Sequence, residues 1–453
     1  MHILALLSSL LIAQTEPAPE PQEIVKPQEV RPLPGELDDV PMFNSNSPEK
    51  IGTEGILLST FPPENKQVPA AHLNFRFSGR FDIFAHHVFG DRELPDLTPM
   101  YLGILIHNPT SEPVTVNILQ AASYLSQPDA PFIQLPPMVP NPTGEVYAGP
   151  GDRVTTEILR EQRQDIWPAQ LTIPPQSSQM LMNLPIPVRT LEPPLNGRST
   201  LMRLRSNGTV YLASLALYAR EDAQGNERAP TLAEWETLLE TGDLAGPRDR
   251  APTPPNQTSG QIIYGRVAGV SKGSQWVASI ADNPITQTLD IPQPGDAFSY
   301  GISTLPGGRL QTGQAQSAPM QVSYSDTAYS AHGNYGVEYR LNLPLQNNTN
   351  NTQTVTVLLQ TPLKEENLSK QGLRFLQPPA PQVFFRGTVR MRYRNDRGIP
   401  VTRYWHLVQR RGQMGDPLLT LEMPPGDLRL VEVDLIYPPD ATPPQVVTVR
   451  TLE

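Results

Sequence analysis

The sequence predicts an all-β protein built from two β-sandwich domains of the immunoglobulin-like or jelly-roll type, with few short helices. Three observations support this prediction. Proline is unusually frequent, with 52 residues in a chain of 453, and proline is excluded from helix interiors and central strands. Short runs that alternate between apolar and polar residues are separated by turns rich in Asn, Gly and Pro. A block of such runs also occurs twice, in the same order.

The repeated block contains an apolar strand, an Asn/Thr turn, a β-branched strand and a Pro-Pro turn. Its first copy begins at Gly103, and the last turn follows Ile173. Its second copy begins at Asn342, and the last turn follows Met423. Two copies in one order suggest a duplicated β-sandwich module.

The length of the chain exceeds what one core usually supports, which favours two domains plus tails. An apolar run over residues 3–13 is too short to span a bilayer and ends at Ala13, a suitable residue before a cleavage site. An uncleaved anchor or a buried strand is the alternative there. The predicted organisation is a signal peptide (1–13), a disordered proline-rich linker (14–50), a first sandwich (51–245), a linker (246–259) and a second sandwich (260–453).

In the first domain, Arg205–Thr209 contains Asn-Gly and predicts a tight hairpin. Thr231 and Glu234 form a capping box that begins a helix, and Trp235 is expected to pack on a sheet. Strands are expected as a pair within 73–89 and at 101–107, 113–120, 153–159, 170–173, 178–187, 199–206 and 209–219. In the second domain they are expected at 261–270, 274–280, 320–325, 335–346, 353–361, 383–394, 400–410, 418–423, 428–436 and 446–451.

Composition excludes several classes of function. The formal net charge of −10 argues against nucleic acid as a partner. The absence of cysteine excludes disulfides, thiolate nucleophiles and Cys-ligated metals. No cofactor is implied, and no segment beyond the signal peptide is apolar for long enough to cross a membrane.

Two motifs suggest chemistry without supporting it. Gly269–Gly273 matches the G-x-S-x-G elbow of esterases, but another strand follows where the elbow requires a helix. His86 and His87 are neighbours on a strand and point to opposite faces, so they cannot easily share a metal. His87 is expected to be a hydrogen-bonded core residue, and His86 is expected to be exposed. A metal site at His86 is the weaker alternative because no third ligand is visible.

A loop over residues 326–336 is rich in aromatic and hydrogen-bonding side chains, including His332 and Tyr335. Such a loop can bind sugars through ring stacking and polar contacts, or it can be structural. The structural interpretation is favoured.

The hairpin from Arg386 to Arg411 concentrates positive charge on an acidic protein. Alternation places several of its arginines on one strand face, where guanidinium groups can bind sulfate, carboxylate or phosphate groups. The alternative is that Glu432 and Asp434 on a nearby strand neutralise them. The candidate binding residues are Arg390, Arg392, Arg394, Arg403, Arg410 and Arg411, with His332 and Tyr335 second.

Four stretches resemble an uncharacterised secreted protein family of cyanobacteria, known only as a domain of unknown function. They are Tyr329–Tyr339, Phe384–Arg390, His406–Gln413 and Tyr437–Val446. The resemblance covers most of the chain, is strongest over 320–453, and implies export to the cell envelope without assigning a catalytic residue. The repeated blocks also resemble, more loosely, immunoglobulin-like modules of bacterial surface proteins.

Together these patterns predict an exported, non-enzymatic envelope protein that binds or organises surface polymers such as an anionic polysaccharide. A glycan-active enzyme with paired carboxylates is one alternative. A purely structural spacer or assembly subunit is the other.

Overall fold

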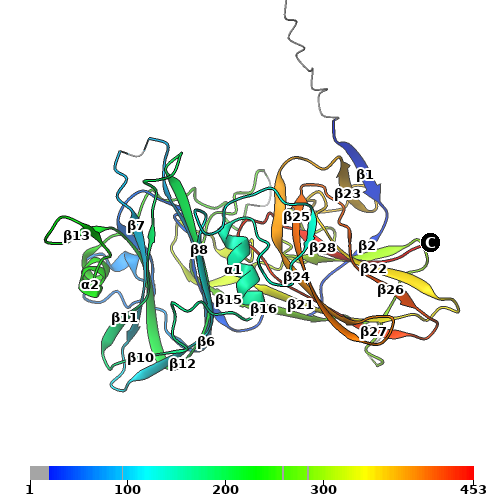
Figure 1. The fold of residues 1–453 in the computed structure, drawn as a ribbon, viewed down its shortest axis with the longest axis horizontal. Coiled ribbons are helices and arrows are strands. Elements are labelled where there is room, and N and C mark those ends of the chain that lie inside the picture. Colours follow the sequence, from blue (N-terminus) through cyan, green and yellow to red (C-terminus); the bar gives the residue numbers. More distant parts are fainter. Residues whose placement is uncertain (1–19, 94, 258–259, 283–284) are drawn as a thin grey trace, which may run out of the picture.

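The computed structural model describes residues 20–93, 95–257, 260–282 and 285–453. Within these ranges the chain is mostly β, with two α-helices, α1 (Pro150–Leu159) and α2 (Leu232–Thr241), and a 3-10 turn at Pro69–Ala71. The predicted all-β class is therefore confirmed. Figure 1 shows one group of strands with α2 on its outer side, a second group near the C-terminus, and α1 between the two groups. Neither helix of the described part has the length and apolar character of a membrane span.

The first group of strands forms two layers around one core. Phe81 and Ile83 of the first layer and Ile104 and Ile106 of the second are fully buried in that core. In spatial order the first layer contains β10 (Gln170–Ile173), β8 (Val114–Leu125), β12 (Leu195–Tyr218), β6 (Phe77–Gly90), β3 (Pro41–Ser45), β15 (Ala268–Lys272), β19 (Ala318–Ser323) and β20 (Ser330–Ala331), with β4 (Lys50–Ile51) beside β6. The second layer contains β11 (Ser177–Ile186), β7 (Met100–Asn108), the C-terminal half of β12, and β5 (Gly55–Ser59). A small hairpin, β13 (Arg220–Glu221) and β14 (Glu227–Arg228), precedes α2.

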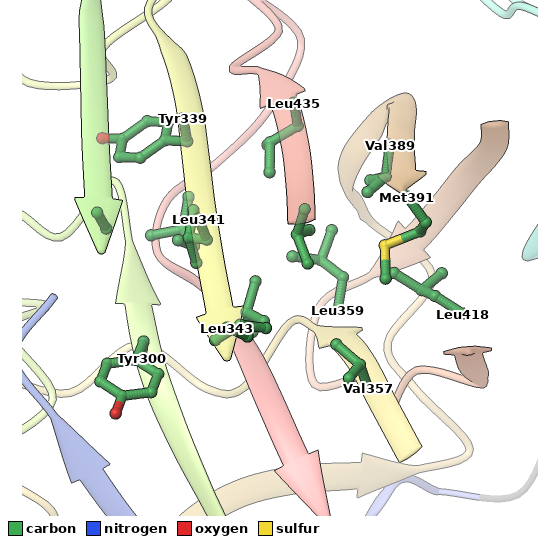
Figure 2. Packing of buried hydrophobic residues seen from close by; sticks show 14 of the residues in the cluster. Tyr300, Tyr339, Leu341, Leu343, Val357, Leu359, Val389, Met391, Leu418 and Leu435 are labelled. Carbon is green, nitrogen blue, oxygen red and sulfur yellow. The ribbon is translucent and has the colours of Figure 1, made fainter. Parts of the chain in front are cut away.

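The second group also forms two layers. One contains β16 (Gln275–Ser279), β21 (Glu338–Gln346), β27 (Leu428–Ile436), β24 (Val383–Arg394), β25 (Pro400–Arg410) and β9 (Met138–Pro140), with β17 (Leu289–Asp290) beside β21. The other contains β2 (Glu29–Arg31), β18 (Ala297–Ile302), β28 (Gln445–Thr451), β22 (Gln353–Gln360) and β26 (Pro417–Met423). Figure 2 shows Leu341 and Leu343 of β21, Val357 and Leu359 of β22, and Met391 of β24 in the core between these layers.

The two copies of the repeated block fold alike. Asn108 accepts hydrogen bonds from the backbone and hydroxyl of Thr110 at 2.9 and 2.7 Å, and Asn347 accepts the same pair from Thr349 at the same distances. The amide of Asn108 also donates to Ile173, and that of Asn347 donates to Met423. Each asparagine therefore ties its own turn to the strand end before the Pro-Pro turn, and the predicted duplication is visible in these contacts.

The predicted hairpin at Arg205–Thr209 is wrong. β12 runs straight through it as one 24-residue strand and passes from the first layer to the second. Asn207 does not take the positive φ that a tight hairpin requires. Its side chain instead accepts a hydrogen bond from the backbone of Thr115, and the register against β6 shifts between Ser206 and Val210. The Asn-Gly pair is an irregularity at which the strand changes layers. The strand pair predicted within 73–89 is likewise the single strand β6.

The strand predicted at 153–159 is helix α1. Pro150 lies at its first turn and Asp152 adds a carboxylate there, both of which favour a helix N-terminus. Val154 and Ile158, four residues apart, are buried on one stripe. The β-branched run Val-Thr-Thr suggested a strand, but packing against β8, β12 and β24 determines the local structure. The other helix, α2, forms as predicted, with the Thr231–Glu234 capping box and a fully buried Trp235.

The predicted disordered linker over 14–50 is wrong for its described part, which begins at residue 20. Residues 22–26 form β1 (Gln22–Lys26), which pairs with β23 (Leu373–Gln377). β2 joins the edge of a larger sheet, and β3 lies inside another sheet between β6 and β15. Proline in this segment lies between or at the start of the strands, where no ladder donor is lost. An extended, proline-flanked chain can therefore serve as an edge strand, although it has too little apolar surface to fold alone.

Strand pairing crosses the predicted boundary between the two domains. β15 follows the predicted linker 246–259, yet it pairs with β3 in the first group. In the other direction, β9 and α1 precede that linker and contact β25 and β24 of the second group. Each group of strands therefore contains segments from both sides of residues 246–259. The division into two domains at this linker stays a prediction. Most other predicted strands are confirmed to within a few residues, whereas 261–267 is irregular. Among the described strands of five or more residues, β1, β3, β5, β18 and β23 were not predicted.

Candidate functional site

The predicted basic stripe is largely neutralised at its centre. Arg390 is only 7% exposed, and its Nε donates to Asp434 at 2.8 Å. Arg392 lies 3.1 Å from both Glu432 and Asp434. Arg390 also donates to the backbone oxygen of Leu159 at the end of α1. Glu432 and Asp434 thus neutralise the central arginines, which is the alternative given in the sequence analysis. These contacts leave Arg390 unavailable to a ligand.

The remaining arginines of the hairpin do not form one surface. Arg394 is exposed and donates to the backbone of Gly398 at 2.9 Å. Arg403 pairs with Met391 in the ladder and therefore lies on the opposite sheet face from Arg390 and Arg392. Arg410 and Arg411 are exposed at the far end of β25. Binding by these exposed arginines stays a prediction.

The aromatic loop is packed within the chain, although the buried Nδ1 atom of His332 has no hydrogen-bond partner among the described residues. His332 is 6% exposed and lies between the rings of Tyr264 and Tyr329, each with a centroid 5.1 Å away. Burial, together with the nearby Lys364, lowers the pKa of His332 to about 4. The hydroxyl of Tyr335 donates to the backbone of Ala441 at 3.0 Å. These contacts are typical of a structural loop, as favoured from the sequence.

The two motifs set aside from the sequence behave largely as expected. Ser271 lies in β15, and after the Gly273 turn the chain enters strand β16, so no esterase elbow is formed. His87 is a fully buried, hydrogen-bonded residue that contacts Ser45 at 2.9 Å and Pro48 at 2.8 Å. His86 is not exposed as predicted, because it is only 8% accessible and bonds Ser199 at 2.7 Å. The described residues contain no group of ligands suited to a metal ion.

Sequence reasoning missed a cleft in which four arginines meet. Arg80 comes from β6, Arg203 and Arg205 from β12, and Arg340 from β21, so both groups of strands contribute. The cleft has a volume of about 330 Å³. Its wall is completed by Asp38, Val40, Leu119, Gln120, Ser274 and Gln275. We refer to this set as the arginine cleft.

The strand register explains why the charges gather. Arg80 and Arg205 are directly opposite in the β6–β12 ladder, and Arg203 is opposite Asp82. Side chains at opposing positions share a face of the sheet. On β21, Arg340 lies two residues from Glu338 and therefore on the same face. The ladder thus brings three arginines to one face of the first layer, and the packing of β21 adds the fourth.

Two buried carboxylates hold these guanidinium groups from behind. Glu338 is 1% exposed and lies 2.7 Å from Arg203 and 2.6 Å from Arg340. Asp82 is fully buried and forms an ion pair with Arg80. Burial works to raise the pKa of Glu338, but Arg203 and Arg340 outweigh it and lower that pKa. For Asp82, burial outweighs the attraction to Arg80 and Arg203, so its pKa is raised.

The face of the cleft toward solvent is positive. Asp38 is the acidic residue among the lining residues, and it already accepts hydrogen bonds from the backbones of Ser274 at 2.7 Å and Gln275 at 3.3 Å. Arg205 is exposed, and among the described residues no carboxylate lies within ion-pair distance of it. Preorganised guanidinium groups can bind a carboxylate, sulfate or phosphate group through paired, charge-assisted hydrogen bonds.

Only part of the arginine cleft can be predicted from the sequence. The alternation Arg203-x-Arg205 places two arginines on one face of a strand and can be read directly. Arg80 and Arg340 are far away in the sequence, and the long-range register between β6, β12 and β21 brings them there. The arginines of the Arg386–Arg411 hairpin are easier to recognise because they lie close together in the sequence, although the central ones already have partners.

Comparison with known proteins gives one match. The family described as a protein of unknown function (DUF3370) matches residues 28–451, which is almost the whole described chain. The chain belongs to the DUF3370 family. None of the curated proteins compared with this DUF3370 chain matches it. The family resemblance noted in the sequence is thereby confirmed as a domain of unknown function, and no catalytic residue is assigned by it.

Proposed function

We propose that this DUF3370 chain is a non-enzymatic, exported protein of the cell envelope that binds an anionic surface polymer through the arginine cleft. One observation carries the proposal: Arg80 and Arg205 lie directly opposite each other on adjoining strands and open into a cleft with Arg203 and Arg340. Like charges at opposing ladder positions destabilise a sheet. An anionic ligand between them removes that cost.

The ligand class follows from the shape and donors of the cleft. Guanidinium forks match the two oxygens of a carboxylate or sulfate, and the amides of Gln120 and Gln275 can bond neighbouring hydroxyl groups. A volume of about 330 Å³ accommodates roughly one or two sugar units. A uronic acid or sulfated sugar within a polysaccharide fits these properties, and the apolar run at 3–13 supports export.

The test compares retention on heparin, a sulfated glycan, with retention on uncharged dextran at increasing NaCl. We expect retention on heparin alone, which weakens steeply with salt. The variants Arg205→Ala and Arg340→Ala should each weaken heparin binding about 10-fold, as expected for the loss of one charge-assisted contact. The matched controls Arg410→Ala and Arg411→Ala remove the same charge from exposed positions of β25 and should leave binding nearly unchanged.

The outcome also separates the alternatives. If Arg410→Ala and Arg411→Ala weaken binding and the cleft variants do not, the ligand uses the exposed hairpin arginines and the cleft proposal is wrong. Shortening of the polymer after incubation would favour a glycan-active enzyme. If neither polymer is retained at low salt, the proposal is also wrong, and a purely structural role is favoured.

A further inference from the structure

A second cavity lies between the two groups of strands, apart from the arginine cleft. Its volume is about 630 Å³. The first group contributes Glu49, His86 and Leu195, and the connection before α1 contributes Phe132. Asp440, in the turn after β27, closes the cavity from the second group. None of the residues predicted as binding sites from the sequence lines it.

The walls of this cavity combine apolar surface with the three carboxyl groups of Glu49, Glu192 and Asp440. Phe132 and Leu195 are 53% and 43% exposed and supply apolar surface, and the guanidinium of Arg386 lies over the Phe132 ring, 5.3 Å from its centroid. Asp440 carries a buried oxygen, Oδ2, that has no hydrogen-bond partner in the described chain. A Cβ atom at Gly151 would lie only 3.0 Å from that oxygen, so the start of α1 must pack closely against this carboxyl.

His86 gives an independent indication of a ligand. It is 8% exposed, lines the cavity, and bonds Ser199 through Nδ1 at 2.7 Å. Its other nitrogen, Nε2, lies 3.8 Å from Glu49, which is beyond hydrogen-bond distance. In the tautomer whose Nδ1 donates to Ser199, Nε2 carries a lone pair and is available as an acceptor, on a side chain that is 11% exposed. Burial, with additional repulsion from His87 and Arg266, lowers the pKa of His86 to about 3, so the ring is neutral.

The carboxyl groups of Asp440 and Glu49 are poorly stabilised as anions. Burial raises the pKa of Asp440 to about 7, although Arg386 opposes the shift. Burial also raises the pKa of Glu49 in spite of its contact with Arg266. A ligand that carries positive charge would stabilise both carboxylates, and an apolar body would cover Phe132 and Leu195.

We propose that this cavity is a binding site for an organic cation: a primary ammonium group attached to an apolar body. The ammonium donates to Asp440 and Glu49 and to the free ring nitrogen of His86, and the apolar body packs against Phe132 and Leu195. Three donors on an ammonium match three acceptors from three separate segments. The site is independent of the arginine cleft, because it has the opposite charge preference and a different set of residues.

The probe is phenethylamine, which combines an ammonium group with an aromatic ring, and the control ligand is the neutral analogue 2-phenylethanol. Titration of the full chain, followed by calorimetry and by NMR of the ligand, should give saturable binding of the amine and at least 10-fold weaker binding of the alcohol. A blocked Phe-Lys dipeptide tests whether the ammonium can come from a lysine of a peptide. Binding of the dipeptide but not of phenethylamine would assign the site to a lysine side chain.

Two variants test the residues. Asp440→Asn and Phe132→Ala should each weaken amine binding at least 10-fold, whereas Asp165→Asn, at an exposed position outside the cavity, should not. Asp440→Asn removes a poorly stabilised buried charge, so it is expected to fold, and its thermal unfolding confirms that. Equal binding of amine and alcohol would overturn the proposal, as would the absence of saturable binding of both amines up to 10 mM or unchanged binding by both cavity variants. Heparin retention should be the same in these variants, so failure here is distinguishable from failure of the arginine cleft.

Discussion

Arg80 and Arg205 occupy directly opposing positions of β6 and β12, where two positive charges share one face of the sheet. Arg80 is held by Asp82 and donates to the backbones of Phe81 at 2.6 Å and Leu204 at 3.3 Å. Arg205 has no such carboxylate partner in the described chain. Under the proposed function, an anion that contacts both residues would offset the repulsion between them.

Removal of Arg205 should therefore raise the free energy of unfolding and at the same time weaken binding of the anion. Arg205→Gln should increase the free energy of unfolding by about 0.5 kcal/mol at low ionic strength, because repulsion with Arg80 is lost. The same variant should lose heparin affinity. Urea unfolding at 20 mM and 500 mM NaCl checks the first part, and the gain should vanish at the higher salt. Arg205→Lys keeps the charge and serves as the control, and an equal gain from it would contradict the electrostatic explanation.

Arg390 is expected to be essential for stability. Arg390→Glu would place a third carboxylate beside Asp434 and Glu432, which already share Arg392, so the new buried carboxylate would have no cationic partner of its own. We expect a loss of roughly 3–5 kcal/mol of unfolding free energy, typical of a broken buried ion pair. Arg394→Glu, on the same strand face but exposed, should change stability by no more than about 0.5 kcal/mol. Urea unfolding of both variants measures the difference, and equal effects would show that Arg390 is not held as described.

Gly103 is expected to be intolerant of a side chain. A Cβ atom at this position would lie 2.9 Å from the Trp235 ring and 3.0 Å from the end of Met180. Because Trp235 is fully buried, Gly103→Ala should destabilise the chain by about 1–3 kcal/mol through overpacking. Gly197→Ala, where the nearest atom is at 3.4 Å, is the matched strand control and should be tolerated. The midpoints of urea unfolding test the pair, and equal midpoints would contradict the packing of α2 on β7.

Asp440 should make stability depend on pH. Its pKa in the folded chain is about 7, compared with an ordinary value of 3.8, so the folded state holds a proton that the unfolded state releases. The stability associated with that proton is fully present below about pH 4 and is lost as the pH rises through 7. Asp440→Asn should therefore match the wild type at pH 3.5 and exceed it by about 4 kcal/mol at pH 8.5, because the difference between a pKa of about 7 and one of 3.8 corresponds to that free energy. Thermal unfolding at both pH values measures this. Asp165→Asn should show no such difference, and a stabilisation by Asp440→Asn that is equal at both pH values would rule out its titration as the cause.

Sequence patterns correctly predicted the turns and the helix start that depend on hydrogen bonds between residues close together in the chain. The Asn/Thr turns were recognised because Asn108 and Asn347 bond residues two positions away, and the α2 capping box was recognised for the same reason. Helix α1 was missed because its β-branched residues favour a strand, and its helical form depends on contacts with three distant strands. The Asn207-Gly208 pair was misread because a long strand that changes layers uses the same residues as a turn.

The candidate sites depend even more on long-range structure. The neutralisation of Arg390 by Asp434 was weighed from the sequence, because both residues lie on predicted strands of one sheet. The arginine cleft joins residues that are up to 260 positions apart, from Arg80 to Arg340, and the cavity at Asp440 joins segments from both groups. No periodicity within a strand contains that information. The residues of each site come together only when the strand register of one sheet and the packing of the other sheet against it are both fixed.

The unbroken course of β12 also has a mechanical consequence. Its first half lies between β6 and β8, and its second half pairs with β7 and β5. Neither layer can come apart without removing a strand from the other, so partial opening of one layer alone is not available at low free energy. Hydrogen exchange should therefore release the amides of both halves of β12 together, at the rate of global unfolding. When the chain is pulled from its ends, we expect both halves of β12 to unfold together as one cooperative unit.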